Sequence, residues 1–415
     1  YNYIHIGNAR SAVAFDTIRR YFEYCGYTVN YISNFTDVDD KIIKAANEAG
    51  ISTKELSDKF IAAFMEDTGQ LGIKPATQNP RVINYMDEII AFVSTLVDKG
   101  FAYVSEGDVY FRVAKSNNYA KLANKTLEDL EIGASGRTDA ETERKENPLD
   151  FALWKAAKEG EVSWDSPWGP GRPGWHIECS VMATEILGDT IDIHGGGADL
   201  EFPHHTNEIA QSEAKTGKTF ANYWMHNGFV NVDNEKMSKS LGNFVTVHDM
   251  LQTVDGQVLR FFLATQQYRK PINFTEKAIH DAEVNLKYLK NTHSLPLTEQ
   301  VNQAELQTYL DTFQEAMDDD FNTANGVTVL FDMAKWINSG NYDQTVKNAF
   351  EKMLQVFGIV FEEETLDEDI EKLIEERQAA RANKDFATAD RIRDELAAQG
   401  IKLLDTKEGV RWTRD

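Results

Sequence analysis

Apolar residues near the start of the chain recur with a helical period. Ala14, Ile18 and Phe22 are four residues apart, and Gly26 follows as a residue type that commonly ends a helix. The spacing predicts a helix over residues 7–25.

The segments that follow alternate between strand and helix. Residues 27–35 are rich in β-branched and aromatic residues and predict a strand, and residues 39–49 predict a second helix. Strand-like segments resume at residues 191–194 and 228–232. This alternation predicts an α/β fold with a doubly wound, parallel, Rossmann-type sheet. In such a fold a strand leads into the first turn, whereas this sequence starts at the turn with Tyr1, so we expect that it lacks its natural N-terminus.

A different pattern interrupts the sheet. Residues 85–99 predict a helix, residues 103–111 predict a hairpin, and a polar stretch follows at residues 137–147. We interpret residues 83–169 as an insertion.

The C-terminal part is almost wholly helical. Residues 302–317 and 322–336 are amphipathic, as expected in an α-helical bundle. The final segment predicts a small α/β unit, with one charged helix over residues 373–399, a glycine stop and a hairpin around residues 407–409.

Size and composition fit a multidomain protein with hydrophobic cores. The 415 residues, 42% of them hydrophobic, suggest two to four domains. No apolar run approaches the roughly 18 residues of a membrane helix, and residues 1–10 do not resemble a secretion signal. Cys25 and Cys179 are the two cysteines, which favours a reducing cytoplasm. We interpret Cys25, at the end of the first helix, as a packed thiol.

The charge is strongly negative but unevenly distributed. A net charge of −24 disfavours non-specific binding to polyanions. Residues 371–415, however, carry ten basic and ten acidic residues. A nucleic-acid contact would meet the least repulsion at this end of the chain.

The first candidate for chemistry is the run His5-Ile-Gly-Asn8 at the start of the first helix. A helix N-terminus attracts phosphate, Gly7 permits close approach to the backbone, and His5 and Asn8 are hydrogen-bond donors. The same residues also suit a simple glycine turn with a capping asparagine.

The second candidate is the run Lys236-Met-Ser-Lys-Ser240, which Leu-Gly-Asn follows. Two lysines in a polar loop next to a glycine can place ammonium groups on a polyphosphate, where they stabilise the negative charge that develops on the leaving group. The alternative is a solvated basic loop.

Together the two runs resemble the HIGH and KMSKS signatures of class I aminoacyl-tRNA synthetases, in the order that the class has. Further stretches narrow the resemblance to the cysteinyl-tRNA synthetase family: residues 35–41 (FTDVDDK), 166–169 (SPWG), 174–180 (GWHIECS), 192–200 (DIHGGGADL), 202–208 (FPHHTNE) and 389–394 (ADRIRD). The resemblance runs over essentially the whole chain. It implies ATP-dependent ligation of L-cysteine to tRNA(Cys), with ATP bound together with Mg²⁺.

Cys179, His204 and Glu208 offer one sulfur, one nitrogen and one oxygen ligand. If Pro203 opens a helix, His204 and Glu208 lie on one face of it, and three ligands with an open position are typical of catalytic zinc. Core packing of the same side chains is the alternative. The resemblance implies that they hold one Zn²⁺, which would bind the thiolate of cysteine and reject serine by roughly 10⁴-fold or more.

The resemblance also assigns further site residues. Thr36, Trp175 and His194 would line the cysteine pocket, Gly195, Gly196 and Gly197 would lie against adenosine, and Asp199 would bind the ribose. His5, Asn8, Lys236 and Lys239 would stabilise the phosphates. Without the resemblance, we would expect a capping threonine, a core tryptophan, a core histidine, an ordinary loop and a solvated aspartate.

The resemblance implies a division of the chain as well. The expected parts are a Rossmann-type catalytic domain at residues 1–82 and 170–245, a connective insertion at 83–169, a stem-contact region at 246–281, a helical bundle at 282–368 and an anticodon-binding unit at 369–415. In that last unit Trp412 would stack on a base, or anchor the core, and Arg391, Arg393 or Arg411 would contact phosphates. We expect a cytoplasmic monomer.

The sequence departs from the family pattern at its start. The family has a further zinc cysteine just before the position of Tyr1, so we expect three protein ligands in the sequence as given, and impaired folding or activity unless residues were merely omitted. Asn8 stands where the signature has histidine and keeps a hydrogen-bond donor.

Two rival functions stay open at this point. A ligase that joins cysteine to an amino sugar would share the zinc and ATP sites but need no anticodon-binding unit. A non-catalytic RNA- or zinc-binding paralogue would need no ATP site.

Overall fold

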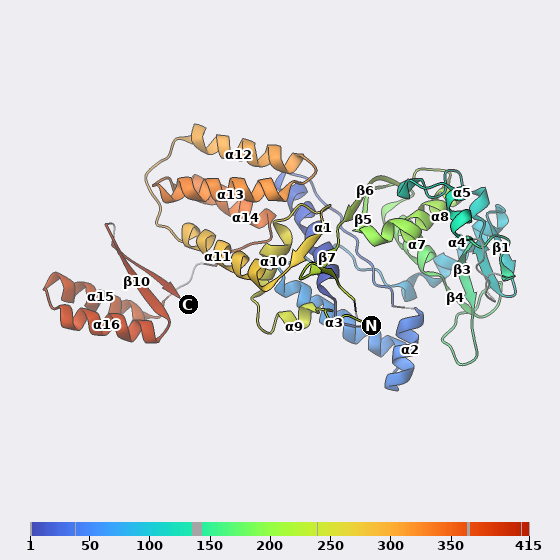
Figure 1. Cartoon of the computed structure of the whole chain (residues 1–415), viewed down its shortest axis with the longest axis horizontal. Coiled ribbons are helices and arrows are strands. Elements are labelled where there is room, and N and C mark those ends of the chain that lie inside the picture. Colours follow the sequence, from blue (N-terminus) through green and yellow to red (C-terminus); the bar gives the residue numbers. More distant parts are fainter. Residues whose placement is uncertain are drawn as a thin grey trace. The chain divides into compact units, whose positions relative to one another are not determined.

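The computed structural model describes residues 2–37, 39–134, 143–238, 240–362, 366–407 and 409–414. The chain forms two compact units, Tyr1–Val360 and Phe361–Asp415. Figure 1 traces the elements of each unit. Among the described residues, no helix is both long enough and apolar enough to span a bilayer.

Helix α1 (Ile6–Tyr24) confirms the first predicted helix. Its apolar face, which includes Ile6, Val13 and Ile18, is buried. The helix ends at Cys25, which is exposed, so the expectation of a packed thiol is wrong. Its position at the helix end explains the difference, because the chain turns there at Gly26 and leaves the apolar face.

Parallel strand pairs form the centre of the first unit, as the predicted α/β fold requires. The elements are β5 (Ile191–Gly197), β6 (Ala221–Asn227), β7 (Val230–Val232), β8 (Glu235–Lys236) and β9 (Ile272–Phe274). Strand β5 pairs in parallel with β6, and β7 pairs in parallel with β9 and antiparallel with β8. Helix α7 (Trp175–Leu187) precedes β5, and α8 (Thr206–Thr216) makes the crossover from β5 to β6.

The predicted strand at residues 27–35 does not form. Within it, Ile32 and Phe35 each make a single parallel bridge, to Gln78 and Arg81 respectively. Two isolated bridges do not make a ladder, so this high β-propensity segment runs as extended chain. Helix α2 (Asp40–Ala49) follows as predicted, and α3 (Thr53–Gln70) comes next.

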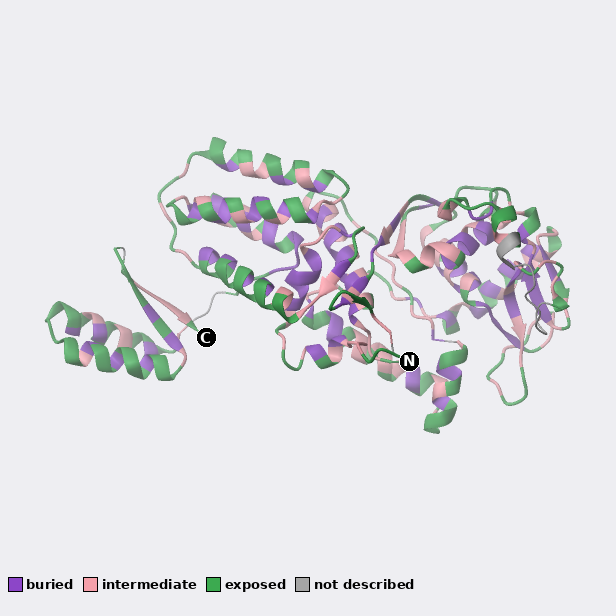
Figure 2. Ribbon diagram, in the orientation of Figure 1, coloured by how far each residue is buried: buried purple, intermediate pink, exposed green. Residues whose placement is uncertain are grey.

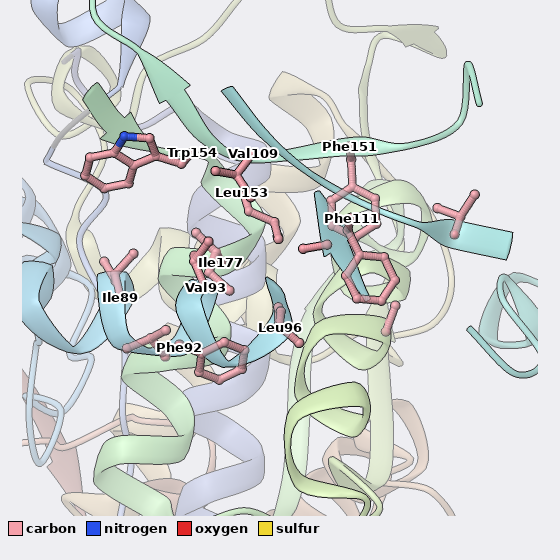
Figure 3. Packing of buried hydrophobic residues seen from close by; sticks show 14 of the residues in the cluster. Ile89, Phe92, Val93, Leu96, Val109, Phe111, Phe151, Leu153, Trp154 and Ile177 are labelled. Carbon is pink, nitrogen blue, oxygen red and sulfur yellow. The ribbon is translucent and has the colours of Figure 1, made fainter. Parts of the chain in front are cut away.

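A four-stranded antiparallel sheet with its own core occupies part of residues 83–173. Its elements are α4 (Met86–Asp98), β1 (Ala102–Ser105), β2 (Asp108–Phe111), α5 (Leu127–Ala134), β3 (Phe151–Ala156) and β4 (Gly171–Pro173). The predicted hairpin is confirmed as β1–β2, with Glu106 and Gly107 both at positive φ in its turn. Figure 3 shows Phe92, Leu96 and Trp154 among the apolar side chains packed between α4 and the sheet. The predicted polar stretch at 137–147 lies partly outside the described residues.

Helices make up the rest of the first unit, as the amphipathic pattern predicts. They are α9 (Val247–Met250), α10 (Gly256–Ala264), α11 (Glu276–His293), α12 (Gln303–Asp318), α13 (Thr323–Asn338) and α14 (Gln344–Val356). Figure 2 shows buried residues on one face of each long helix, and Phe313, Leu330 and Phe350 are fully buried there. Helix α10 packs against both α1 and α11, so the bundle joins directly to the first helix of the chain.

The second unit contains two helices and a hairpin: α15 (Glu368–Ala382), α16 (Phe386–Ala398), β10 (Ile401–Thr406) and β11 (Gly409–Arg414). The hairpin is confirmed, but the single helix predicted over residues 373–399 is wrong. The chain turns at Lys384, which has a φ of +62°, and this folds α16 back along α15. Trp412 packs against the apolar core of this unit, which favours its interpretation as a core anchor.

Candidate active site and metal centre

His5 caps the N-terminus of α1. Its Nδ1 accepts the backbone N–H of Asn8 at 3.1 Å, and the Asn8 Oδ1 accepts the backbone N–H of His5 at 3.4 Å. Burial lowers the pKa of His5, although Asp199 opposes this shift. A neutral His5 whose Nδ1 accepts must carry its proton on Nε2. The helix cap expected from the alternative interpretation of this motif is therefore present. It leaves two hydrogen-bond donors for a phosphate, the His5 Nε2 and the Asn8 amide.

Gly7 is required for this arrangement. A Cβ at residue 7 would lie 2.8 Å from Cε1 of the His5 ring. The glycine therefore makes room for the folded histidine itself, in addition to any ligand.

The lysine loop is joined to the start of α1 by backbone hydrogen bonds. Ile6 N–H donates to Val245 O at 3.0 Å, and Val247 N–H donates to Ile4 O at 2.9 Å. Asn243 organises the loop, because its Oδ1 accepts from Ser238 N–H at 2.8 Å. The two motifs, more than two hundred residues apart in sequence, thus lie at one place.

The lysines themselves are described unequally. Lys236 is exposed at the end of β8. Lys239 lies outside the described residues.

Cys179, His204 and Glu208 converge. Their ligand atoms all lie within 4.8 Å of one another. Cys179 comes from α7, while His204 precedes α8 and Glu208 lies in its first turn. His204 Nε2 is 3.5 Å from Glu208 Oε2, so the two residues share a face as expected from their spacing.

Glu208 has the environment of a metal ligand. Its side chain is 0% exposed, and its Oε2 has no hydrogen-bond partner within the described part of the chain. Its Oε1 is 3.0 Å from His194 Nε2. Because a buried carboxylate oxygen without a partner is costly, a cation at this position would satisfy it.

The electrostatics of the other ligands agree with this interpretation. Burial opposes ionisation of Glu208, but His194 and the nearby histidines hold its pKa below the ordinary value. Burial, and then the negative charge of Glu208, raise the pKa of the Cys179 thiol well above its usual range. A divalent cation would favour both anions at once. One sulfur, one nitrogen and one oxygen donor in a buried site fit Zn²⁺.

Several residues that orient this cluster were not predicted from the sequence. His176 Nδ1 is 2.9 Å from His204 Nδ1, which leaves His204 Nε2 for a metal. Asn34 Nδ2 donates to Cys179 Sγ at 3.4 Å. His176 has a signal in the sequence, because it lies three residues before Cys179 on the same helix.

A second histidine cluster lies on the other side of Glu208. His194, His205 and Glu208 also place their ligand atoms within 4.8 Å of one another. His205 Nδ1 is 2.8 Å from His226 Nε2, and Trp224 stacks on His194 at 4.7 Å. Burial and the neighbouring histidines lower the pKa of His205, whereas Glu208 raises the pKa of His194 against the effect of burial. His205, Trp224 and His226 were also missed.

The residues predicted to bind the substrate differ in their exposure and in their contacts with the candidate metal site. Trp175 is 46% exposed and stacks on His204 at 3.9 Å, so it is a wall of an open site and not a core residue. His194 contacts Glu208, as described above. Thr36 is half-buried in the extended segment that contains Asn34.

The three consecutive glycines of β5 each pack closely against a side chain. A Cβ at Gly195 would lie 2.5 Å from the Phe15 ring, one at Gly196 would lie 2.8 Å from Leu200, and one at Gly197 would lie 2.4 Å from the Asp199 carboxylate. The absence of side chains at these positions therefore brings α1 and Asp199 close to the strand.

Comparisons with known proteins identify the family of the chain. Residues 1–284 match the family described as "tRNA synthetases class I (C) catalytic domain", residues 312–362 match the DALR domain, and residues 363–412 match the "Cysteinyl-tRNA ligase anticodon binding domain". A protein of Streptococcus thermophilus named "Cysteine--tRNA ligase" is 95% identical over 415 residues, which is 100% of this chain and 93% of that protein. The chain belongs to the cysteinyl-tRNA synthetase family.

Other relatives give the same family and fold. A "Cysteine--tRNA ligase" of Streptococcus agalactiae is 81% identical, again over 100% of this chain and 93% of that protein. A methionyl-tRNA synthetase of Mycobacterium tuberculosis shares the fold of this cysteinyl-tRNA synthetase family member at a TM-score of 0.62 and 15% identity, covering 86% of this chain and 87% of that one. The expected class I Rossmann-type architecture is therefore confirmed.

Proposed function

We propose that this family member joins L-cysteine to tRNA(Cys) in two steps at the expense of ATP. A carboxylate oxygen of cysteine attacks the α-phosphorus, and the bond to pyrophosphate breaks, which gives cysteinyl adenylate. A terminal ribose hydroxyl of the tRNA then attacks the carbonyl carbon, and AMP leaves with the bonding electrons. Identity of 95% along the whole chain to a protein of that name carries this proposal.

Neither step requires a nucleophile from the protein, so catalysis consists of alignment and stabilisation of charge. In this proposal His5 and Asn8 donate to the phosphates of ATP at the positive end of α1. Lys236 and Lys239 neutralise the pyrophosphate leaving group, together with Mg²⁺. Asp199 accepts hydrogen bonds from the ribose, and Gly195 to Gly197 leave the backbone open to adenosine on the face away from Phe15.

The proposal assigns one zinc ion to Cys179, His204 and Glu208. When bound, zinc supplies an open ligand position for the substrate thiolate. Thr36, Trp175 and His194 surround the rest of the amino acid. Since a serine hydroxyl is a much poorer zinc ligand than a thiolate, a site built on that bond discriminates by roughly 10⁴-fold or more without editing.

Contacts with tRNA are assigned to the C-terminal half. Residues 246–281 would contact the stem and the bundle at 282–368 would support it, while the unit at 369–415 would bind the anticodon.

Phe386, at the start of α16, is 60% exposed and offers an unused aromatic face for base stacking. It is a better candidate than Trp412, which packs on the core. Arg391, Arg393 and Arg411 would contact phosphates. A monomer in the cytoplasm is part of the proposal.

Changing Phe386 to alanine is expected to raise KM for tRNA in aminoacylation by about 10-fold, since stacking of one base is worth roughly 1–3 kcal/mol. Exchange of pyrophosphate into ATP without tRNA should not change. Steady-state aminoacylation at varied tRNA concentration measures this, with Val360→Ala, another exposed apolar position, as a control. An unchanged KM for tRNA would contradict the stacking role.

The amino-sugar ligase is the weaker alternative, because residues 363–412 match an anticodon-binding domain that such an enzyme would not need. Two assays on the full-length protein test the proposed function. Cysteine-dependent exchange of pyrophosphate into ATP is expected, followed by transfer of cysteine to tRNA. Exchange without transfer would favour the amino-sugar ligase, and no exchange would favour a non-catalytic paralogue.

A further inference from the structure

A fully buried arginine joins three separate parts of the first unit. Arg260 of α10 is 0% exposed. Its Nη1 donates to Asp16 Oδ2 of α1 at 2.6 Å, its Nη2 donates to Thr17 Oγ1 at 3.1 Å, and its Nε donates to Phe357 O at 2.9 Å. One planar guanidinium thus connects the middle of α1 to the end of α14.

The chain after α14 is shaped around this guanidinium. Gly358 has a φ of +74°, and a Cβ there would lie 2.3 Å from Arg260 Cζ. Asp16 has two further donors: Arg20 Nε donates to the same Oδ2 at 2.8 Å, and the backbone N–H of Lys74 donates to Oδ1 at 3.0 Å. The carboxylate and the guanidinium are therefore both held by several partners, which makes the junction rigid.

Helix α1 carries this junction at one place and the phosphate donors at another. Asp16 lies eleven residues after His5, which is roughly 16 Å along a helix at 1.5 Å per residue. Because an α-helix is stiff over three turns, an element that is held at Asp16 keeps a fixed distance to His5 at the start of the same helix. On the other side of the junction, α14 belongs to the bundle that supports tRNA in the proposed function.

We propose that Arg260 is a positioning residue that fixes the phosphate-binding end of α1 relative to the helical bundle, so that the acceptor end of a bound tRNA meets the adenylate. This inference rests on the proposed function. In the proposed function, adenylate formation uses α1, the β5–β6 pair, the lysine loop and the metal ligands. Transfer to tRNA also requires that the bundle keeps a fixed position relative to α1. Loss of the junction therefore acts on the second step and spares the first.

Arg260→Lys tests this assignment, because an ammonium group keeps the charge but cannot bond to α1 and to Phe357 O in the planar geometry of the guanidinium. We expect exchange per titrated active site to stay within about 3-fold of wild type. Single-turnover transfer from preformed adenylate to tRNA should fall by about 10- to 100-fold, because a displacement of about 1 Å can cost 10²-fold. Arg112→Lys is the matched control: Arg112 also bonds a carboxylate, Glu146, and a carbonyl, Gly100 O, but lies away from α1.

Thr17→Val provides a second variant if Arg260→Lys does not fold. It removes one acceptor of the guanidinium at nearly constant volume, and transfer should fall by about 3- to 10-fold with exchange unchanged. Thr95→Val is its control, since Thr95 Oγ1 donates to Ala91 O within α4 just as Thr17 Oγ1 donates to Val13 O within α1.

The outcomes separate the possibilities. A transfer defect confined to Arg260→Lys and Thr17→Val supports the inference. Equal loss of exchange and transfer, or loss of neither, overturns it, because both exclude a role specific to the second step. A wild-type protein that does not catalyse exchange contradicts the proposed function, and this inference falls with it.

Discussion

Changing Cys179 to serine is expected to lower kcat/KM for cysteine in pyrophosphate exchange by about 10³-fold or more, because the variant loses a thiolate ligand of the proposed metal. The thiol is half-buried beside the buried Glu208, whose Oε2 has no hydrogen-bond partner among the described residues. Serine keeps the size of the side chain but does not ionise to replace the sulfur ligand. Exchange kinetics together with metal content per chain measure the effect.

Cys25→Ser is the matched control for this prediction. Cys25 is exposed at the end of α1, far in sequence from the cluster, and both exchange and metal content should match wild type. If Cys179→Ser kept its metal and its kcat/KM for cysteine, Cys179 would not be a ligand and the zinc-based account of specificity would be wrong.

The second large effect is expected at His5. His5→Asn should lower the rate of exchange by about 10²- to 10³-fold, the usual cost of losing one donor to developing charge. Asparagine keeps the N-cap, because its Oδ1 can accept the Asn8 N–H as His5 Nδ1 does, but it has no donor at the position of Nε2. The helix should therefore stay intact while phosphate binding is lost.

His5→Gln separates the two roles of the histidine further. Its amide reaches approximately the position of Nε2, so it should restore part of the rate that His5→Asn loses. Thermal unfolding of His5→Asn should resemble wild type, whereas His5→Gln lacks the acceptor at the Nδ1 position and should unfold at a lower temperature. His280→Asn, at an exposed histidine of α11, serves as the control. Equal activity of His5→Asn and wild type would mean that His5 only caps the helix.

Local pattern was sufficient for most of the helices and for the two hairpins. The helices at residues 302–317 and 322–336 were predicted because the helical spacing of apolar residues is a local property of the sequence. The strand at 27–35 failed for the opposite reason, since a strand exists only where a partner pairs with it over several residues. The turn at Lys384 was not predicted, because lysine seldom adopts a positive φ and its presence in a sequence does not indicate a turn.

The candidate site was predicted only where a motif marked it. Cys179, His204 and Glu208 were found because the last two have helical spacing and because a family pattern includes all three. Asn34 and His226 approach the cluster from segments distant in sequence, and no spacing rule connects them to it. The junction at Arg260 could not be predicted for the same reason, because its partners Asp16 and Phe357 lie 244 and 97 residues away in the sequence.

X-ray absorption at the zinc edge tests the central claim most directly. The account predicts one zinc per chain, and one additional sulfur ligand when cysteine is added but none when serine is added. Protein purified without zinc, or a zinc spectrum that cysteine leaves unchanged, would contradict it.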